Sequence, residues 1–285
     1  MRNFYSGLTK LSRMSERLSP TGSDLKRLCD IAAKAVVSAI QDMVGTNAGG
    51  QMVKMGGDGT PTKRIDHAAE EAVLKVLRAS GLGFSVLSEE IGSVKIGEGS
   101  DYFLHLDPLD GTFNAIAGIP FYSVSIYISR DDCRFAYIFD LARGRSFYAE
   151  ACRGAYAEPE SRLFVSQNTD LKDFSISAYT LRPNTARITG IGDRVRRIRT
   201  LGSASLEMAL VASGKLDAFV DLRGMMRVVD VAAGKLMIEE AGGMVTDADG
   251  DELEMGANMW QKKYLIGSNG LQHEELLGII GGDSH

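Results

Sequence analysis

The most informative segment of this chain is Asp107-Pro108-Leu109-Asp110-Gly111-Thr112, which sets two carboxylates around a sharp turn directly after the apolar run 102–106. Proline cannot donate to a sheet ladder and biases Asp107 toward extended geometry. The pattern therefore predicts a strand that stops at Pro108, with both aspartates at its carboxyl end. Hard divalent cations such as Mg2+ take oxygen ligands and often share them with substrate phosphate. Taken alone, the hexapeptide fits a metal and phosphate site and a solvated turn about equally well.

The residues that follow the second aspartate indicate how a phosphate would be held. Gly111 lets the backbone approach a ligand closely, and residues 112–114 are expected to open a short helix. The unpaired N–H groups at such a helix start can hold a phosphoryl oxygen.

Composition narrows the class of protein. The chain has 285 residues and a formal net charge of -5, which argues against a general nucleic-acid binder, because such proteins neutralise phosphates with a basic surface. The three cysteines, Cys29, Cys133 and Cys152, are widely spaced and suit reduced thiols better than a disulfide framework. The N-terminus has no signal-peptide core, and no stretch approaches about 20 apolar residues. We expect a cytoplasmic protein that binds neither nucleic acid nor membrane.

Apolar periodicity predicts an α+β chain in two lobes. Ser23 is the expected N-cap of a long helix whose apolar stripe runs from Leu25 to Met43, and a glycine-rich, mobile loop is expected at 45–59. Further elements are expected at 66–79, 84–87, 122–128, 134–140, 146–150, 174–178, 204–213, 218–221, 229–241 and 264–266. The three strands over 122–150 suggest an antiparallel meander. The change of pattern predicts a metal-binding α+β lobe over 1–158 and an α/β substrate-recognition lobe over 159–285, with a ligand between them.

Further acidic residues extend the turn into a constellation. Glu89 and Glu90 follow a strand, so they can meet Asp107 in one crevice, although a solvated pair is the simpler interpretation. Asp230 precedes a helix start, where a carboxylate is favoured by the helix dipole and where capping is its more common role. Asp66, taken by itself, is another capping acid.

Together these blocks resemble the inositol monophosphatase and fructose-1,6-bisphosphatase superfamily, and they look most like its archaeal dual-activity members. The resemblance covers roughly residues 24 to 270, with the blocks 57–66, 89–90, 107–114 and 229–243 in the family's order. It implies a layered αβαβα sandwich, a homodimer, and Mg2+-dependent hydrolysis of small phosphorylated sugars or polyols without a covalent phosphoenzyme.

The resemblance also implies two or three Mg2+ ions in each active site. The first would be held by Glu89, Asp107 and the Leu109 carbonyl, and the second by Asp107, Asp110 and Asp230. Two such cations can polarise an attacking water and stabilise the leaving oxygen. In the glycine-rich loop, Lys54 and Asp58 are expected to close over the site and to assist a third, weaker metal.

Catalytic roles follow from the same resemblance. Thr112, oriented by Asp66, would position and deprotonate the water, while the Gly111 and Thr112 amides bind the phosphoryl oxygens. Glu90 is expected to hydrogen-bond near the metal-bound water rather than to bind the metal.

Substrate choice is expected to lie in the second lobe. Ser203 and Ala204 match the family segment whose backbone contacts substrate hydroxyls. Arg223 stands where inositol-specific members have a glutamate, seven residues before Asp230, and its guanidinium favours a second phosphate over a neutral polyol. Tyr179, Arg182 and Arg227 are further candidates for the phosphate pocket, although each arginine also fits a solvated surface charge. We therefore expect fructose 1,6-bisphosphate as the principal substrate and inositol phosphates as secondary ones.

Other interpretations fit less well. An aspartyl-phosphate phosphatase needs Asp-x-Asp-x-Thr, whereas these aspartates are three apart with proline between them. The acids at 247–251 lack the glycine and closing glutamate of a calcium loop, and 190–195 lacks the third glycine of a dinucleotide fingerprint. Within the family, a phosphatase for 3'-phosphoadenosine 5'-phosphate or NADP and a non-catalytic binder of phosphorylated ligands stay open as alternatives.

Overall fold

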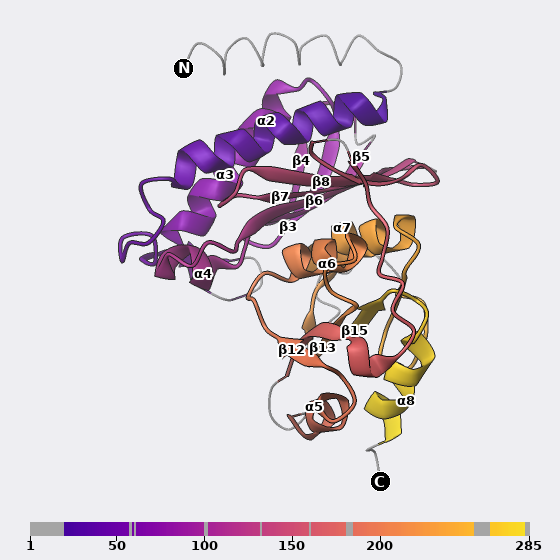
Figure 1. Ribbon diagram of the computed structural model, residues 1–285. Helices are drawn as coiled ribbons and strands as arrows, with labels where there is room; N and C mark the ends of the chain where they lie inside the picture. Colours follow the sequence, from indigo (N-terminus) through magenta and orange to yellow (C-terminus); the bar gives the residue numbers. More distant parts are fainter. Residues whose placement is uncertain are drawn as a thin grey trace.

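Helices and sheets alternate in five layers along the molecule (Figure 1). The computed structural model describes residues 20–56, 59, 61–99, 102–131, 133–159, 161–180, 185–253 and 263–282. The layers run from α2 (Gly22–Ile40) and α3 (Arg64–Ala79), through an eight-stranded sheet, α6 (Ala204–Ala212) and α7 (Val228–Glu240), and a five-stranded sheet, to α5 (Thr185–Gly192) and α8 (His273–Gly282). The expected αβαβα sandwich is confirmed.

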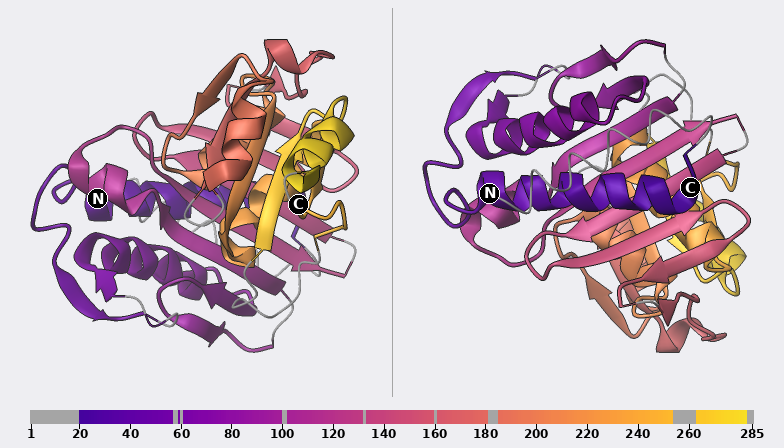
Figure 2. Two further views of the ribbon diagram at one scale, coloured as in Figure 1. Left: turned by 90° about the horizontal axis from the view of Figure 1, so that it is seen from below. Right: turned by 90° about the horizontal axis from the view of Figure 1, so that it is seen from above.

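The N-cap of the outer helix α2 lies two residues before the expected one. Thr21, not Ser23, is the N-cap: its hydroxyl accepts from the Asp24 amide at 3.3 Å, and the Asp24 carboxylate accepts from the Thr21 amide at 3.0 Å. This reciprocal capping box satisfies two helix-start donors at once, which a single Ser23 cap would not do. Figure 2 shows α2 and α3 side by side across the strands of the large sheet.

The large sheet has the strand order β10-β9-β8-β7-β6-β5-β3-β4. Its strands are β3 (Phe84–Ser88), β4 (Gly92–Ile96), β5 (Tyr102–Asp110), β6 (Ser123–Arg130), β7 (Cys133–Asp140), β8 (Arg145–Glu150), β9 (Gly154–Ala157) and β10 (Ser161–Arg162). The antiparallel meander expected over 122–150 is confirmed by the β6–β7 and β7–β8 pairings. The neighbours β3 and β5 run parallel, with Ser88 opposite Leu106. Their carboxyl ends therefore meet at one edge, which brings Glu89 beside Asp107.

The strand β5 does not stop at Pro108, as the sequence predicted, but continues to Asp110. Asp107 pairs with Ser125 and Asp110 with Ser123, so the register shifts by one residue around Pro108. Such a bulge accommodates a residue without an N–H donor and bends the strand. Proline thus reshapes the strand end instead of terminating it.

The segment expected to be a glycine-rich loop contains a strand. β1 (Met52–Met55) pairs antiparallel with β2 (Pro61–Lys63), and we call this unit the β1–β2 hairpin. Asp58 lies outside the described residues. The hairpin leads directly into α3, whose first turn carries Asp66.

The smaller sheet has the order β12-β11-β13-β15-β14. Its strands are β11 (Ser175–Tyr179), β12 (Arg197–Arg199), β13 (Ala218–Met226), β14 (Met244–Thr246) and β15 (Lys263–Ser268). The short elements α4 (Thr112–Ala117) and η1 (Leu171–Asp173) complete the set. The proposed division between residues 158 and 159 stays a prediction.

Three large hydrophobic cores join the layers in the described part of the chain. One joins α2 and α3 to the large sheet, a second packs α6 and α7 between the sheets, and a third lies under α5 and α8. The helix α7 is buried on nearly all sides, as expected of a helix enclosed by two sheets. Among the described residues, no helix is long and apolar enough to cross a membrane.

His105 provides a test of the β5 environment. It is 2% exposed, neither ring nitrogen has a hydrogen-bond partner among the residues that the structure describes, and the ring contacts Phe103 and Tyr127. Burial lowers the pKa of His105 to about 4. A histidine whose pKa is lowered by folding costs stability as pH falls below its unfolded value, about 6.5, because the unfolded chain then binds more protons.

We therefore expect His105→Phe to be more stable than the wild type at pH 7.5, with the difference growing by about 2 kcal/mol at pH 5. Urea unfolding at the two pH values measures this. A difference that does not change with pH would contradict the assignment of a neutral buried imidazole.

Candidate active site

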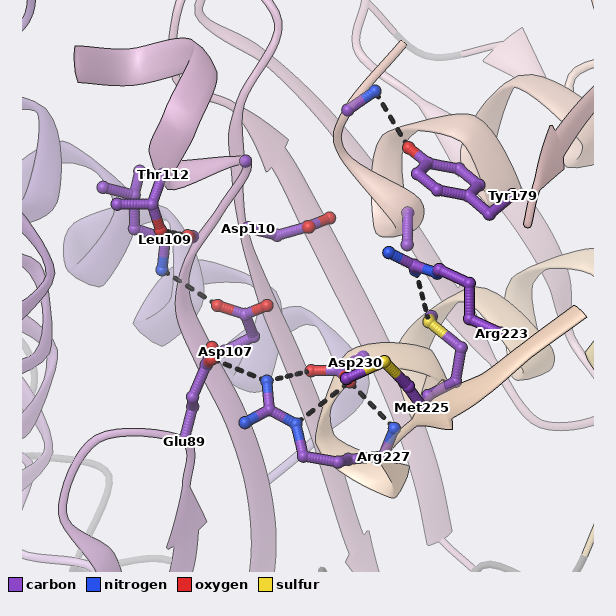
Figure 3. Close-up of a pocket in the computed structure, with 14 residues that line it drawn as sticks. Glu89, Asp107, Leu109, Asp110, Thr112, Tyr179, Arg223, Met225, Arg227 and Asp230 are labelled. Atoms are coloured by element: carbon purple, nitrogen blue, oxygen red, sulfur yellow. Dashed lines mark hydrogen bonds and ion pairs between the residues drawn. The ribbon is translucent and has the colours of Figure 1, made fainter. Parts of the chain in front are cut away.

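Three carboxylates from separate elements meet at the edge where β3 and β5 end. Glu89 follows β3, Asp107 lies in β5, and Asp230 lies in the first turn of α7. Each offers an oxygen, and these oxygens all lie within 4.8 Å of one another. The three side chains point toward a common centre in Figure 3. Sequence reasoning expected this convergence, although the residues are up to 141 positions apart.

Asp110 lies in the same cavity but outside that group of three. Its Oδ2 accepts from the Ser203 hydroxyl at 2.8 Å, from the Ser205 amide at 2.7 Å and from the Ser205 hydroxyl at 2.6 Å. The start of α6 therefore orients this carboxylate. The Ser203 side chain is fully buried and donates to Asp110, while its neighbour Ala204 lines the cavity. The expected backbone contact of Ser203 and Ala204 with substrate hydroxyls stays a prediction. The metal-binding role of Asp110 stays a prediction.

The turn after β5 is shaped by local hydrogen bonds. The Leu109 amide donates to Asp107 Oδ1 at 3.1 Å, and the Thr112 hydroxyl donates to the Leu109 carbonyl at 3.1 Å. Gly111 has φ 93°, and a Cβ there would lie 2.9 Å from the Gly202 carbonyl oxygen. Only glycine fits this left-handed position at the start of α4. The short helix expected after Asp110 is present.

Asp66 and Thr112 are brought together as expected. Asp66 is 4% exposed and hydrogen-bonds the Thr112 side chain. Burial raises the pKa of Asp66 to about 6, against the opposing effect of the Thr112 bond. The carboxylate is thus mostly ionised at pH 7 and remains basic enough to accept a proton.

Burial and mutual repulsion dominate the electrostatics of the site. Burial raises the pKa of Glu89 to about 7, with Arg227 acting against the increase and Asp230 adding to it. The pKa of Asp107 is raised well above its ordinary value by burial and then by Glu89, Asp110 and Asp230. Burial also raises the pKa of Asp110, against its serine hydrogen bonds. Closely spaced anions held in this way favour a cation.

Arg227 was predicted to lie in the phosphate pocket. Although Arg227 lines the cavity, its Nη2 lies 2.6 Å from Glu89 Oε1 and 3.0 Å from Asp230 Oδ1. Its backbone amide also donates to Asp230 at 2.8 Å. The arginine therefore places one positive charge beside the carboxylates of Glu89 and Asp230. Its position three residues before Asp230, at the start of a helix, is the sequence feature from which this pairing could have been predicted.

Arg223 and Tyr179 form the opposite wall of the cavity. The Arg223 guanidinium stacks on the Tyr179 ring at 4.4 Å and donates from Nε to Asp221 at 2.9 Å. The Tyr179 hydroxyl donates to Glu207 and accepts from the Gly202 amide at 2.8 Å. Sequence reasoning missed Asp221 and Glu207, because both lie inside apolar elements. Arg182 lies outside the described residues.

The cavity between these walls has a volume of about 390 Å3. The residues that line it include Glu89, Asp107, Leu109, Asp110, Gly111, Thr112, Tyr179, Ala204, Arg223, Arg227 and Asp230. Glu90 is not among its lining residues and accepts a hydrogen bond from the Thr62 hydroxyl. Lys54 pairs with Glu70 at 3.6 Å rather than with the three carboxylates.

Comparison with known proteins matches residues 24–281 to the model of the inositol monophosphatase family. A fructose-1,6-bisphosphatase/inositol-1-monophosphatase of Methanothermobacter thermautotrophicus is 37% identical over 87% of this chain and 93% of its own length. A bifunctional NADP phosphatase/NAD kinase of Methanococcus maripaludis is 36% identical over 87% of this chain and 48% of its own length. A solved Pyrococcus horikoshii structure, described as similar to inositol-1 monophosphatase, is 32% identical with TM-score 0.80 and covers 93% of this chain and 100% of its own.

Glu89 provides a test of how burial and neighbouring charges shift the pKa values in the site. A carboxyl whose pKa is raised by folding favours the folded state only while it is protonated, so its contribution is lost as pH rises from its unfolded pKa toward the folded one. For Glu89 this window runs from 4.5 to about 7. In chelator, we expect Glu89→Gln to gain about 3 kcal/mol of unfolding free energy relative to the wild type between pH 4.5 and 7.5, at about 1.4 kcal/mol per pKa unit.

Saturating divalent cation should reverse this order at pH 7.5, because the wild type then gains binding energy that the variant lacks. Denaturant unfolding with and without cation measures both effects. Glu71→Gln, at an exposed pair with Arg78, is the matched control and should show neither. A parallel pH response of Glu89→Gln and the wild type would contradict the buried, repelled carboxyl.

Proposed function

The chain belongs to the inositol monophosphatase family, and from this premise we propose that it is a Mg2+-dependent fructose-1,6-bisphosphatase that also hydrolyses inositol 1-phosphate. The observation that carries the proposal is the group of three carboxylates within 4.8 Å, Glu89, Asp107 and Asp230, at a cavity walled on the other side by Arg223. The homologue of Methanothermobacter thermautotrophicus, whose name gives both activities, supports the pair of substrates.

The donor set fits Mg2+. All candidate ligands are oxygens, which hard cations prefer, and the carboxylates repel one another, so a divalent charge relieves that repulsion. Glu89, Asp107 and the Leu109 carbonyl would hold one ion, and Asp107, Asp110 and Asp230 a second. When bound, the ions supply Lewis acidity that activates a water and neutralises charge on the leaving oxygen.

The chain's own groups orient the reaction. The Thr112 hydroxyl has a single hydrogen and two acceptors within reach, the Leu109 carbonyl and Asp66, so it can turn from the first to the second when it passes a proton on. With a pKa of about 6, Asp66 is suited to take up a proton that the attacking water loses through Thr112. Gly111 and Thr112 line the same cavity, and their amides would bind the phosphoryl oxygens.

Arg223 supports a bisphosphate. Stacking on Tyr179 and the hydrogen bonds to the fully buried Asp221 restrict the guanidinium to one orientation at the cavity wall. A pre-oriented guanidinium loses little side-chain entropy on binding, and its planar donors match phosphate oxygens. Asp221 also neutralises part of its charge, so we expect Arg223 to contribute orientation as well as attraction.

A second candidate substrate is the 2'-phosphate of NADP. The Methanococcus maripaludis relative, named for NADP phosphatase and NAD kinase, matches 87% of this chain. Because the chain corresponds to 48% of that protein, this match supports a phosphatase for NADP less directly than the first relative supports a sugar phosphatase. A 3'-phosphoadenosine 5'-phosphate phosphatase and a non-catalytic binder complete the alternatives.

We also propose a cytoplasmic homodimer. The free thiols of Cys29, Cys133 and Cys152 support a reducing compartment. The dimer rests on the family resemblance alone, and light scattering of the full chain measures it.

Phosphate release tests the proposed reaction. We expect Mg2+-dependent release from fructose 1,6-bisphosphate and, more slowly, from inositol 1-phosphate, with 3'-phosphoadenosine 5'-phosphate and NADP as competing substrates in the panel. Asp107→Asn should lower the rate at least 100-fold while the protein stays folded, because Asp107 is shared by both proposed metal positions. Faster release from NADP would replace the sugar assignment, and no release from any substrate would favour the binder.

Arg223 should determine the preference between substrates. We expect Arg223→Glu to lower kcat/KM for fructose 1,6-bisphosphate about 10 to 100-fold and to change that for inositol 1-phosphate by less than about 3-fold, because only the bisphosphate carries a second phosphate. Arg194→Glu reverses an exposed charge that pairs with Glu275 and is the control. Equal losses for both substrates would show that Arg223 does not discriminate between them.

A further inference from the structure

A fully buried carboxylate outside the cavity supports the turn that carries Glu89. Glu70 lies on α3 and is 0% exposed. Its Oε1 accepts from the Ser88 hydroxyl at 2.6 Å and from the Ile91 amide at 2.9 Å. These two donors flank Glu89 and Glu90, so one carboxylate oxygen fixes both ends of the turn.

The other oxygen of Glu70 faces the β1–β2 hairpin. Glu70 Oε2 has no hydrogen-bond donor among the residues that the structure describes, and it lies 3.6 Å from Lys54 Nζ on β1. On β2, the buried Thr62 donates its hydroxyl to Glu90. Each strand of the hairpin therefore contacts an acid that belongs to, or supports, the same turn.

We propose that Glu70 is a positioning residue that holds Glu89 in the geometry needed for the metal, and that its pair with Lys54 couples the β1–β2 hairpin to metal affinity. This inference rests on the proposed function, because it takes the bound ion to be Mg2+ at Glu89. Glu70 acts through Glu89 and does not contact the reacting atoms.

The burial of Glu70 explains why the turn is sensitive to the loss of this carboxylate. A carboxylate without solvent contact is costly unless its oxygens are satisfied. Here the turn satisfies one oxygen, and the other is 3.6 Å from Lys54 Nζ with no hydrogen bond from any residue in the described part of the chain. Removing the acid would leave the Ser88 hydroxyl and the Ile91 amide without their acceptor. The turn would then lose two of the contacts that restrain Glu89, which would keep its amide bond to the Leu106 carbonyl at 3.2 Å and its side-chain pair with Arg227.

Coupling between hairpin and metal is reciprocal. If hairpin docking through Lys54 increases metal affinity by some factor, metal binding must favour docking by the same factor. Metal should therefore slow hydrogen exchange in the hairpin. A residue that contributes only to folding would show no such link.

Four variants separate these roles. Glu70→Ala removes both functions of the carboxylate, whereas Glu70→Gln keeps an acceptor for Ser88 and Ile91 and loses the charge that attracts Lys54. Lys54→Met removes the same ion pair from the other side. Glu71→Gln, the next residue of α3, removes an exposed acid that pairs with Arg78 and is the matched control.

Mg2+ affinity is measured by calorimetry without substrate, and hydrogen exchange of residues 52–55 is measured with and without Mg2+. We expect Glu70→Ala to bind Mg2+ about 10 to 100-fold more weakly, the range for residues that orient a metal ligand. Glu70→Gln and Lys54→Met should each weaken Mg2+ binding about 2 to 5-fold, and the double variant that combines them should weaken it no further. Both single variants and the double variant should lose the Mg2+-dependent protection of the hairpin against hydrogen exchange.

Wild-type Mg2+ affinity in folded Glu70→Ala would overturn the positioning role. If Glu70→Ala does not fold, Glu70→Gln and Lys54→Met decide: wild-type affinity and protection in both would overturn the inference. Weaker Mg2+ binding by the Glu71→Gln control would also overturn the inference, because the loss of any negative charge on α3 would then explain the effect. If the wild type itself binds no Mg2+, the proposed function fails and the inference falls with it, whereas normal wild-type binding with unaffected variants removes the inference alone.

Discussion

Mutual repulsion among closely spaced carboxylates is the constraint on which this structure depends. Glu89, Asp107 and Asp230 place oxygens within 4.8 Å of one another, and Asp110 adds a fourth acid to the same cavity. Such a group is unfavourable without compensating charge, because burial and like charges both oppose ionisation. The surrounding chain therefore has to hold the acids in place, and much of the local architecture serves that purpose.

Each acid is held by a different part of the fold. Asp107 is fixed by the bulge in β5 and the amide of Leu109, and Asp110 by the two serines at the start of α6. Glu89 and Asp230 share the guanidinium of Arg227. The partners come from the end of β5, the start of α6 and the residue before α7, so the site forms only when the first and second halves of the chain are packed together.

The middle layer explains how the halves meet. The helices α6 and α7 are enclosed by the two sheets, and the N-terminal ends of both point at the cavity, where Ser205 and Asp230 lie. The parallel pair β3 and β5 is equally important, because it aligns two carboxyl ends in a sheet whose other pairings are antiparallel. A fully antiparallel sheet would have placed Glu89 and Asp107 at opposite edges.

The sequence alone determined the layered fold, the family and the residues that gather at the site. These depend on local residue patterns and on the order of the sequence blocks, and both can be read along the chain without a structure. The sequence also predicted the Asp66–Thr112 pair. It placed the first helix cap at Ser23 and ended β5 at Pro108, since propensities do not reveal a reciprocal capping box or a bulge that accommodates proline. Only the tertiary structure paired Arg227 with the carboxylates, Ser203 with Asp110, and the buried acids Asp221 and Glu207 with the cavity-wall residues Arg223 and Tyr179. Those assignments depend on distances between remote segments, and chain packing decides which charged or polar group a buried side chain meets.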